Sequence, residues 1–378
     1  MTFDPNIKIG VLGGGQLGRM MIQSAIDFNL QIKCMDPDEN APCKFLATEF
    51  VHGNIHDNEQ VIAFGQDCDV ITVEIENVSI EGLEELEAQG KKVFPQPRVL
   101  KTIKDKGLQK QFYLDHDIPT SEFVFIEKKE DLVEFTNMLP AVNKLRTEGY
   151  DGRGVQVIKS SKDIDKGFEA PSILEKFVDY DREISVIVSR NESGDMETFP
   201  VVELEYHPEA NLVEFLFSPS TLSVEMQQKA ADLAKKVISA FDMVGLLAVE
   251  MFATKSGEIL VNECAPRTHN SGHHSIEGNI TSQFEQHIRA ILNLSPGATD
   301  IKGSAVMINL LGEEGYAGVA RYEGIDESLQ IPGLHVHLYG KKMTKPFRKM
   351  GHVTLVGNDL EELKTTARRV KEQIKIIA

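Results

Sequence analysis

The most restrictive feature of the sequence is the stretch 259–274, where an apolar run meets a proline and a dense series of polar groups follows. Residues 259–261 indicate a strand, and Pro266 ends it because proline cannot donate a hydrogen bond to a sheet. A second apolar run lies upstream, across a turn at Ser256-Gly257, so the sequence predicts a β-hairpin over residues 246–264. The polar groups that follow are too many for a core and too specific for a linker, and we expect a binding site there.

The predicted hairpin carries an acidic residue on each arm. Glu250 would lie almost opposite Asn262 and Glu263, and two carboxylates with one amide oxygen suit Mg²⁺, a hard cation that takes oxygen ligands. Because neighbours on a strand point to opposite faces, Asn262 and Glu263 reach one ion only if the strand is distorted, and Pro266 favours that. The alternative is a hairpin with a solvated acidic edge.

Length and composition limit the possible functions. With 378 residues, of which 41% are hydrophobic, the chain is long enough for two or three domains with real cores. The net charge of −18 disfavours non-specific nucleic-acid binding, so we expect no nucleic-acid partner. The four cysteines show no C-x-x-C pairing, the first residues lack a signal-peptide pattern, and no apolar run approaches the ~18 residues of a membrane span. We therefore expect a cytoplasmic protein with reduced thiols and no membrane contact.

Residues 7–36 carry a strand, a glycine-rich turn and a helix. The apolar run 7–12 leads into Gly13-Gly14-Gly15-Gln16-Leu17-Gly18, and a second strand ends at Asp36. This is the G-x-G-x-x-G pattern of dinucleotide-binding folds. Its physical content is narrower, because glycines and helix N–H groups can hold any phosphate. NAD or FAD is therefore one alternative among several phosphate ligands.

Two glutamates follow the next predicted strand. Residues 70–73 indicate a parallel strand whose carboxyl end delivers Glu74 and Glu76. Ligands of open α/β sheets bind beyond such ends, so both side chains are candidates for the crevice of the glycine turn. The alternative is a pair of exposed loop acids. A helix over 81–90 and two prolines then mark a boundary near residue 98.

A basic segment and a second glycine-rich loop follow. Four lysines, at 101, 104, 106 and 110, lie in one predicted helix that ends near Asp117, and the alternative to a site is a solvated helix face. Lys144 ends a predicted strand over 141–145, and a strand over 155–158 follows a loop with three glycines in six residues, 149–154. Such a loop can fold over a triphosphate, with Lys144 as a point charge. The alternative is a flexible hairpin tip.

Further predicted elements surround these segments. Backbone groups of a strand over 173–178 could hold an adenine edge, and Glu183 could hold a ribose. We expect an antiparallel pair at 200–205 and 212–217, helices over 226–241 and 277–294, a boundary at Pro296-Gly297, strands over 304–311, 334–339 and 352–356, and a helix to the C-terminus. Four cations in the last part, Lys341, Lys345, Arg348 and Lys349, indicate an anion pocket, with a solvated hairpin face as the alternative.

Together these motifs resemble the ATP-grasp superfamily, and within it the 5-(carboxyamino)imidazole ribonucleotide synthetases. The resemblance rests on Gly-Gly-Gln-Leu-Gly at 14–18, Glu74-Ile75-Glu76, the loop from Gly149 to Gly154, the run from Asn262 to His273, and Arg348-Lys349-Met350-Gly351-His352. It implies an α/β (α+β) protein with an ATP-grasp fold. A Rossmann-like ribonucleotide-phosphate-binding domain would span 1–98, an ATP-grasp domain with central and lid subdomains 99–297, and a C-terminal domain that completes the substrate site 298–378.

The resemblance also implies roles for residues at matching positions. The ATP site would comprise Lys106, Lys144, Gly149, Tyr150, Asp151, Gly152, Arg153, Gly154, Val155, Glu175, Lys176, Phe177, Val178, Glu183, Tyr206, Asn262 and Glu263, and Mg²⁺ would bind Glu250, Asn262 and Glu263. The ribonucleotide would contact Gly14, Gln16, Leu17, Glu74, Glu76, Tyr150, Asp151, Arg153, Ser271, Lys341, Arg348 and Lys349, and Arg267, His269, Asn270 and Lys341 would be catalytic. Lys106 stands where relatives often have arginine, and Tyr206 where a histidine is frequent, with His207 one residue later.

The implied reaction is carboxylation of the exocyclic amine of 5-aminoimidazole ribonucleotide, with ATP and bicarbonate as co-substrates, through carboxyphosphate. It gives 5-(carboxyamino)imidazole ribonucleotide, ADP and phosphate in purine biosynthesis. ATP and Mg²⁺ are the implied cofactors, the ribonucleotide and bicarbonate the partners, and a homodimer the implied assembly. The alternatives are another ATP-grasp enzyme, either biotin-linked or a formate-dependent phosphoribosylglycinamide transformylase, an NAD-linked oxidoreductase built on residues 7–36, and a non-catalytic nucleotide sensor.

Overall fold

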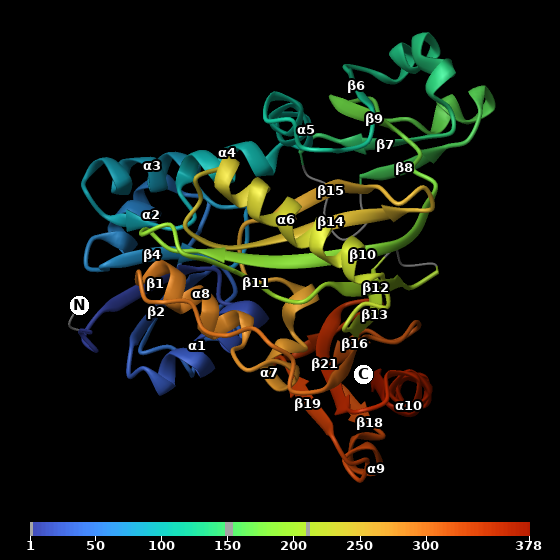
Figure 1. Cartoon of the computed structure of the whole chain (residues 1–378). Helices are drawn as coiled ribbons and strands as arrows, with labels where there is room; N and C mark the ends of the chain where they lie inside the picture. Colours follow the sequence, from blue (N-terminus) through green and yellow to red (C-terminus); the bar gives the residue numbers. More distant parts are fainter. Residues whose placement is uncertain (1–2, 148–153, 209–211) are drawn as a thin grey trace.

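The computed structural model of the protein describes residues 3–147, 154–208 and 212–378 (Figure 1). Its strands form a parallel N-terminal sheet, a small antiparallel sheet, a long antiparallel sheet and two short strand pairs. The small sheet lies at one end of the molecule (Figure 1), and the C-terminal part of the chain contributes three strands to the long sheet.

The N-terminal unit is, within the described chain, a five-stranded parallel sheet in the order β3-β2-β1-β4-β5. Its elements are β1 (Lys8–Leu12), α1 (Gln16–Asp27), β2 (Gln31–Asp36), β3 (Glu49–His52), α2 (Asn58–Gly65), β4 (Val70–Val73), α3 (Ile80–Ala88) and β5 (Lys92–Val93). Gly13 turns the chain from β1 toward α1 with a φ of 102°, which favours glycine. The predicted strand, turn and helix are confirmed, and β1 and β4 end at the same sheet edge.

The single helix predicted around the lysines is two helices, α4 (Pro97–Lys104) and α5 (Lys106–Asp115). Asp105 separates them with an extended backbone, and its side chain accepts hydrogen bonds from the N–H groups of Gly107 and Leu108. The Arg146 guanidinium also holds this carboxylate, at 2.6 Å. Because an aspartate at a helix N-cap stabilises the helix by ~1 kcal/mol, the sequence starts a new helix here and places Lys106 in its first turn.

The small sheet has the order β6-β9-β7-β8. Its elements are β6 (Phe123–Ile126), η1 (Lys129–Met138), β7 (Ala141–Leu145), β8 (Val155–Ile158), η2 (Ser161–Lys166) and β9 (Ser172–Lys176). The predicted strands over 141–145 and 155–158 are confirmed, and they pair with each other, Lys144 opposite Val155. Lys144 therefore lies opposite the first residue of the strand that follows the predicted glycine-rich loop.

The long sheet runs in the order β15-β14-β10-β12-β13-β16-β21-β19, with β11 paired to β10. Its strands are β10 (Tyr180–Arg190), β11 (Met196–Thr198), β12 (Val202–Tyr206), β13 (Val213–Ser218), β14 (Gly245–Thr254), β15 (Ile259–Ala265), β16 (Ser304–Leu311), β19 (Leu334–Leu338) and β21 (Lys349–Gly357). The sheet continues through the pairing of β13 with β16, across the boundary predicted at 297. That boundary and the one at 98 stay predictions.

Two further helix predictions differ from the structure. The helix expected over 277–294 is two, α7 (Ser275–Gly278) and α8 (Gln283–Ile291), and Ser282 caps the second by accepting from Glu285 N–H. The chain does not end in a helix, because β22 (Lys375–Ile377) follows α10 (Leu360–Gln373) and pairs with β18 (Arg321–Glu323). The remaining elements are η3 (Asn270–Gly272), β17 (Gly318–Val319), α9 (Ile325–Ser328) and β20 (Met343–Thr344).

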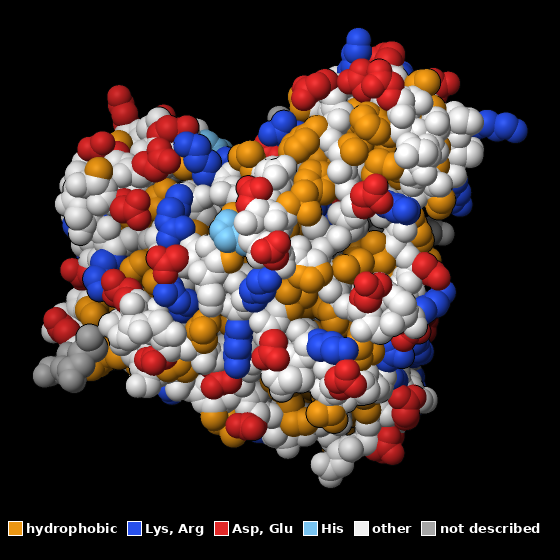
Figure 2. All heavy atoms as spheres, turned by 45° about the horizontal axis from the view of Figure 1, so that its top comes forward, with side chains coloured by type: hydrophobic (Ala, Val, Ile, Leu, Met, Phe, Trp, Pro, Cys, Tyr) orange, Lys and Arg blue, Asp and Glu red, His pale blue; other side chains and the backbone are white. Residues whose placement is uncertain are grey.

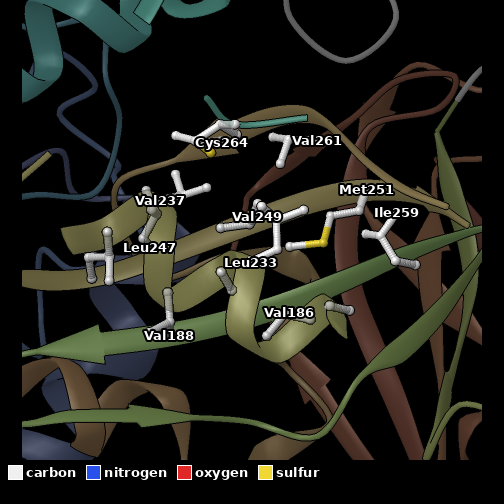
Figure 3. Packing of buried hydrophobic residues seen from close by; sticks show 14 of the residues in the cluster. Val186, Val188, Leu233, Val237, Leu247, Val249, Met251, Ile259, Val261 and Cys264 are labelled. Carbon is white, nitrogen blue, oxygen red and sulfur yellow. The ribbon is translucent and has the colours of Figure 1, made fainter. Parts of the chain in front are cut away.

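The core that supports the predicted hairpin lies between the long sheet and α6 (Val224–Ala240). Figure 3 shows Leu233 and Val237 of α6 among side chains of β10, β14 and β15. Leu247 and Val249, on β14, are fully buried there. The helix predicted as core, over 226–241, is confirmed in that role, and it fixes one face of the hairpin.

None of the helices in the described parts of the chain has the length and apolarity needed to span a bilayer. Figure 2 shows acidic and basic side chains interspersed over the face that carries the small sheet, and the surface is hollowed beside that sheet. Charge on this face is therefore mixed rather than gathered into one sign.

Replacing Leu247 with alanine should lower the free energy of unfolding by about 2–5 kcal/mol, because it leaves a cavity in a packed core. Urea unfolding followed by circular dichroism measures this. Val224→Ala is the matched control, since the Val224 side chain is 83% exposed and its loss should change the value by about 0.5 kcal/mol or less. A loss below about 1 kcal/mol for Leu247→Ala would contradict the packing described.

Candidate active site

The acidic hairpin is distorted at the predicted place. Glu250 on β14 pairs with Glu263 on β15, but the next residue, Met251, pairs with Val261, so Asn262 is an extra residue in the ladder. This is a β-bulge, which bends a strand and changes the direction of its side chains. In a regular strand, buried and exposed side chains alternate, but Asn262 and Glu263 are both partly exposed. Each of them contacts a lysine from another unit.

Lysines from two segments face the bulge. Lys106, in the first turn of α5, forms a hydrogen-bonded ion pair with Glu263. Lys144, at the end of β7, donates to Asn262 Oδ1 at 3.0 Å and lies 3.0 Å from Glu175 Oε1. The predicted ATP residues Lys106, Lys144, Glu175, Asn262 and Glu263 are therefore brought together.

Lys110 belongs to the same cluster, although the sequence did not mark it as a site residue. Its side chain is only 3% exposed, lies 2.9 Å from Glu175 Oε2 and donates to Thr120 and Ser121. Burial alone would raise the pKa of Glu175, but the Lys110 and Lys144 charges hold it well below its usual range. Burial lowers the pKa of Lys110 to about 8 against the opposing pull of Glu175. Its spacing of four from Lys106, on one helical face, was the signal for it.

The two hairpin carboxylates differ in their electrostatics. Burial and then the Glu263 charge raise the pKa of Glu250, whereas the Lys106 charge lowers the pKa of Glu263. His269 Nε2 lies 3.7 Å from Glu250 Oε1. Within the described residues, no three of His, Cys, Asp and Glu gather in a way that could hold a metal ion. Any cation here would have these two carboxylates and the Asn262 amide as its protein donors.

The predicted nucleoside side of the site lies along β9 and β10. The backbone N–H groups of Lys176 and Phe177 already donate to carbonyls of the small-sheet unit, so a base would meet other backbone groups of 175–178. Burial raises the pKa of Glu183, while hydrogen bonds from Tyr180 and Tyr206 oppose that rise. Tyr206 therefore lies beside Glu183, and His207 packs edge-on against Phe347 instead.

Most of the glycine-rich loop lies outside the part of the chain that the structure describes. Gly149, Tyr150, Asp151, Gly152 and Arg153 lie outside the described residues, so their predicted contacts stay predictions. Gly154, with a φ of 72°, accepts from Leu145 N–H at 2.8 Å, and Val155 begins β8. The loop thus leaves and rejoins the small sheet next to Lys144.

The polar run after the hairpin leads to the N-terminal unit. Arg267 Nε lies 2.9 Å from Glu76 Oε1, which ties the run to the end of β4. His269 Nδ1 and Ser271 Oγ are 2.9 Å apart, and Ser271 also bonds Ser185. Asn270 exchanges hydrogen bonds with Asn309 on β16, which sequence reasoning missed. The predicted residues of this run are brought together between Glu250 and Glu76.

The glycine turn of the N-terminal unit holds carboxylates. Glu74 Oε2 accepts from Gly18 N–H at 2.7 Å, and Asp36 Oδ2 accepts from Gly14 N–H at 2.7 Å. Burial raises the pKa of Glu74 to about 7, although the Gly18 bond and the Lys341 charge oppose it. The Leu17 side chain lies in the hydrophobic core, so only its backbone could meet a ligand. Gln16 begins α1 at the rim of this crevice, partly exposed.

The C-terminal cations lie over the same crevice. A cavity of about 250 Å³ is lined by Gly15, Asp36, Asp38, Asn40, Ala41, Pro42, Lys341, Lys342, Met343 and Arg348. Lys341 donates to the Lys349 carbonyl at 2.8 Å, and Arg348 donates to the Met343 carbonyl. The predicted anion pocket needs correction: Lys341 and Arg348 line the cavity as expected, but Lys345 and Lys349 do not, and Lys342 lines it in their place.

Three domain families match successive parts of the chain. They are the ribonucleotide synthetase preATP-grasp domain (residues 6–104), the ATP-grasp domain (residues 111–284) and the phosphoribosylaminoimidazole carboxylase C-terminal domain (residues 305–366). The N5-carboxyaminoimidazole ribonucleotide synthases of Synechocystis sp. and Bacillus subtilis are each 37% identical to this protein. Each alignment covers 95% of this chain, and it covers 94% of the Synechocystis protein and 93% of the Bacillus subtilis protein. The chain belongs to the N5-carboxyaminoimidazole ribonucleotide synthase family. The ATP-grasp fold expected from the sequence is thereby confirmed.

Solved structures agree with this membership. The N5-carboxyaminoimidazole ribonucleotide synthetase of Thermotoga maritima is 40% identical, with a TM-score of 0.91 over 98% of this chain and 99% of that one. The N5-carboxyaminoimidazole synthase of Aspergillus clavatus, solved in complex with ADP and 5-aminoimidazole ribonucleotide, is 32% identical, with a TM-score of 0.89 over 97% of this chain and 99% of that one. The chain spans about two thirds of some longer relatives of the synthase family: 66% of the phosphoribosylaminoimidazole carboxylase of Vigna aconitifolia and 64% of that of Candida glabrata.

The Glu74 carboxyl should make the stability of this family member fall between about pH 5 and 7. Its folded pKa of about 7 exceeds the ordinary 4.5, so the stability that its protonated form contributes is present below pH 4.5 and is lost as the pH rises through 7. The loss amounts to about 3 kcal/mol at most, and Glu74→Gln, which does not titrate, should lack it. Unfolding of both proteins at pH 5 and 7 measures the difference. Equal pH slopes would contradict the burial of this group.

Proposed function

We propose that the protein carboxylates the exocyclic amine of 5-aminoimidazole ribonucleotide, using ATP and bicarbonate, in purine biosynthesis. The observation that carries this is the 2.9 Å contact between Arg267 and Glu76. It joins the lysine-and-carboxylate cluster of the ATP-grasp unit to the crevice of the N-terminal sheet. A phosphoryl donor and a second, anionic substrate can thus meet across one polar run.

The reaction fits the groups in that run. Bicarbonate is a poor electrophile, and attack of its oxygen on the terminal phosphorus of ATP breaks the bond to ADP and gives carboxyphosphate. Carboxyphosphate then releases phosphate and passes its carbon, as CO₂, to the amine of the ribonucleotide, which loses one proton. We assign Arg267, His269 and Asn270 to hold bicarbonate in line, since preorganised donors and close placement lower the barrier of such a transfer. Lys106 and Lys144 would offset charge on the phosphates.

Mg²⁺ fits the donor set of the hairpin. Glu250, Glu263 and the Asn262 amide are hard oxygen donors, and a set of only three leaves positions for water and phosphate oxygens, as Mg²⁺ prefers. The like charges of Glu250 and Glu263, paired across the ladder, also favour a cation between them. Held by these three residues, Mg²⁺ would supply positive charge that offsets the negative charge of the transferring phosphoryl group.

We assign the ribonucleotide to the crevice of the N-terminal unit. Lys341, Lys342 and Arg348 line the cavity there and suit a phosphate, while Glu74 and Glu76 suit the amine and hydroxyl groups. The Aspergillus clavatus relative holds both ADP and this ribonucleotide, which supports the pairing of substrates. The loop 149–155 would cover the nucleotide and exclude water, which hydrolyses carboxyphosphate.

The NAD-linked alternative is disfavoured by the glycine turn. A dinucleotide pyrophosphate needs the N–H groups at the start of α1, and Glu74 already accepts from Gly18 there. Asp36, the candidate ribose ligand, is bonded to Gly14 N–H and to Asp38 N–H. An anion would have to displace a carboxylate at each of these points, so a pyrophosphate is a poor fit.

We further propose a homodimer in the cytoplasm. All four cysteines lie in the described residues and none forms a disulfide, which fits a reducing compartment. Light scattering of the purified protein tests the assembly.

The proposed function predicts that ADP release requires both the ribonucleotide and bicarbonate. Purified protein with Mg-ATP should release ADP at its full rate only when both are present, because bicarbonate accepts the phosphoryl group and the ribonucleotide consumes the carboxyphosphate that forms. A coupled ADP assay with each substrate omitted in turn measures this. Release that depends on formate instead would favour the transformylase, and tight binding of NADH without binding of ATP would overturn the proposal.

Glu263→Gln should reduce ADP release by at least ~10²-fold, because it removes a carboxylate that holds the cation and the charge that Lys106 pairs with. The matched control is Glu258→Gln, an exposed glutamate in the turn of the same hairpin, which should keep the wild-type rate. Steady-state kinetics with a melting curve for each variant separates catalysis from stability. Near-normal turnover of folded Glu263→Gln would refute the assigned role.

A further inference from the structure

Asn309 is a fully buried amide in the middle of β16, a strand that is otherwise apolar after its first residue. A buried amide without partners costs about 1–3 kcal/mol, and even a paired one adds little net stability over an apolar side chain of the same shape. Stability alone therefore does not explain an asparagine here. Its contacts lead to the polar run that follows the acidic hairpin.

Asn309 forms a reciprocal pair with Asn270. Asn309 Nδ2 donates to Asn270 Oδ1 at 2.9 Å, and Asn270 Nδ2 donates to Asn309 Oδ1 at 2.8 Å. Asn309 Nδ2 also donates to the Val213 carbonyl at 2.8 Å. A carbonyl can only accept, so Val213 fixes which end of the Asn309 amide is nitrogen. The reciprocal pair then fixes the orientation of the Asn270 amide.

The backbone of this run is held by a different residue. The Gln283 side chain accepts from His269 N–H at 2.8 Å and donates to the His269 carbonyl at 2.7 Å. The position of the chain at 269–270 is therefore set without Asn309. Asn309 instead fixes the rotation of the Asn270 side-chain amide. Within the described residues, one N–H and one lone pair of the Asn270 amide are left for a ligand.

We propose that Asn309 is a positioning residue for bicarbonate: it fixes the Asn270 amide so that an N–H, and not a second acceptor, faces the anion. This rests on the function proposed above. Asn309 lies on β16, within the segment that matches the C-terminal domain family. The C-terminal domain would thus orient the bicarbonate site as well as supply cations to the ribonucleotide cavity.

Two variants of Asn309 test this. Asn309→Leu removes the pair with a side chain of similar size that suits an apolar strand. Asn309→Asp keeps the shape but offers only acceptors, so it sets an oxygen against the Val213 carbonyl and no longer favours one orientation of the Asn270 amide over the other. The matched control is Asn279→Leu, because Asn279 is also fully buried and donates to a backbone carbonyl, that of Thr299, away from the polar run.

The measurements are the KM for bicarbonate, the KM for ATP and the ADP released per carboxylated product. We expect Asn309→Leu to raise the KM for bicarbonate by about tenfold, the equivalent of one lost hydrogen bond to an anion, with the KM for ATP unchanged. Asn309→Asp should raise it further, although its shape is closer to asparagine. ADP per product should rise in both, because carboxyphosphate is held less well. Asn279→Leu should change none of these.

The proposal is overturned if both folded variants keep the wild-type KM for bicarbonate, or if the KM values for ATP and bicarbonate rise together in step with a fall in melting temperature. Loss of folding in both variants would also overturn it, since the pair would then be a structural tie. Failure of the proposed function has a different signature: the wild-type protein itself would release no ADP in response to bicarbonate and ribonucleotide.

Discussion

The site depends on one irregularity, the extra residue at Asn262 in the β14–β15 ladder. In a regular strand Asn262 and Glu263 would point to opposite faces, and only one of them could meet the lysines. The bulge lets Lys144 reach Asn262 while Lys106 reaches Glu263. Pro266 then ends the strand, so that Arg267 leaves the sheet and contacts Glu76 of another unit. Without the bulge and the proline, the two lysines and Glu76 would not meet one continuous polar run.

The lysines around the bulge are already paired with carboxylates of the protein. Three lysines, at 106, 110 and 144, face three carboxylates, at 175, 250 and 263. A triphosphate adds several negative charges to a partly buried place, where charge interactions are stronger than in water. The lysines already form ion pairs with Glu175 and Glu263, so they cannot neutralise the charge of the phosphates alone. This is a physical reason for a divalent cation that does not depend on any resemblance.

The sequence predicted the parts of this arrangement that depend on local chemistry. Pro266 indicated both the end of β15 and its distortion, and the spacing of Lys106 and Lys110 placed both on one helical face. What it could not predict depends on contacts between distant segments. Asp105 breaks a helix partly because Arg146 holds it, and Asn309 matters only through its partner at 270. The sequence does show Asn309 as a single asparagine in an apolar strand, but it does not indicate that Asn270 is its partner.

The glycine turn shows why a fold fingerprint does not identify a ligand. A side chain at Gly15 would place its Cβ 2.2 Å from Glu74 Oε1, and one at Gly18 would place it 2.6 Å from Glu74 Oε2. The glycines are thus needed for a carboxylate of the protein itself, which occupies the start of α1 in place of a phosphate. Because Glu74 is held there, the end of β4 is fixed and Glu76 is presented to Arg267. The glycine pattern that suggests a dinucleotide site therefore holds Glu74 in place at the crevice, next to the contact between Glu76 and Arg267.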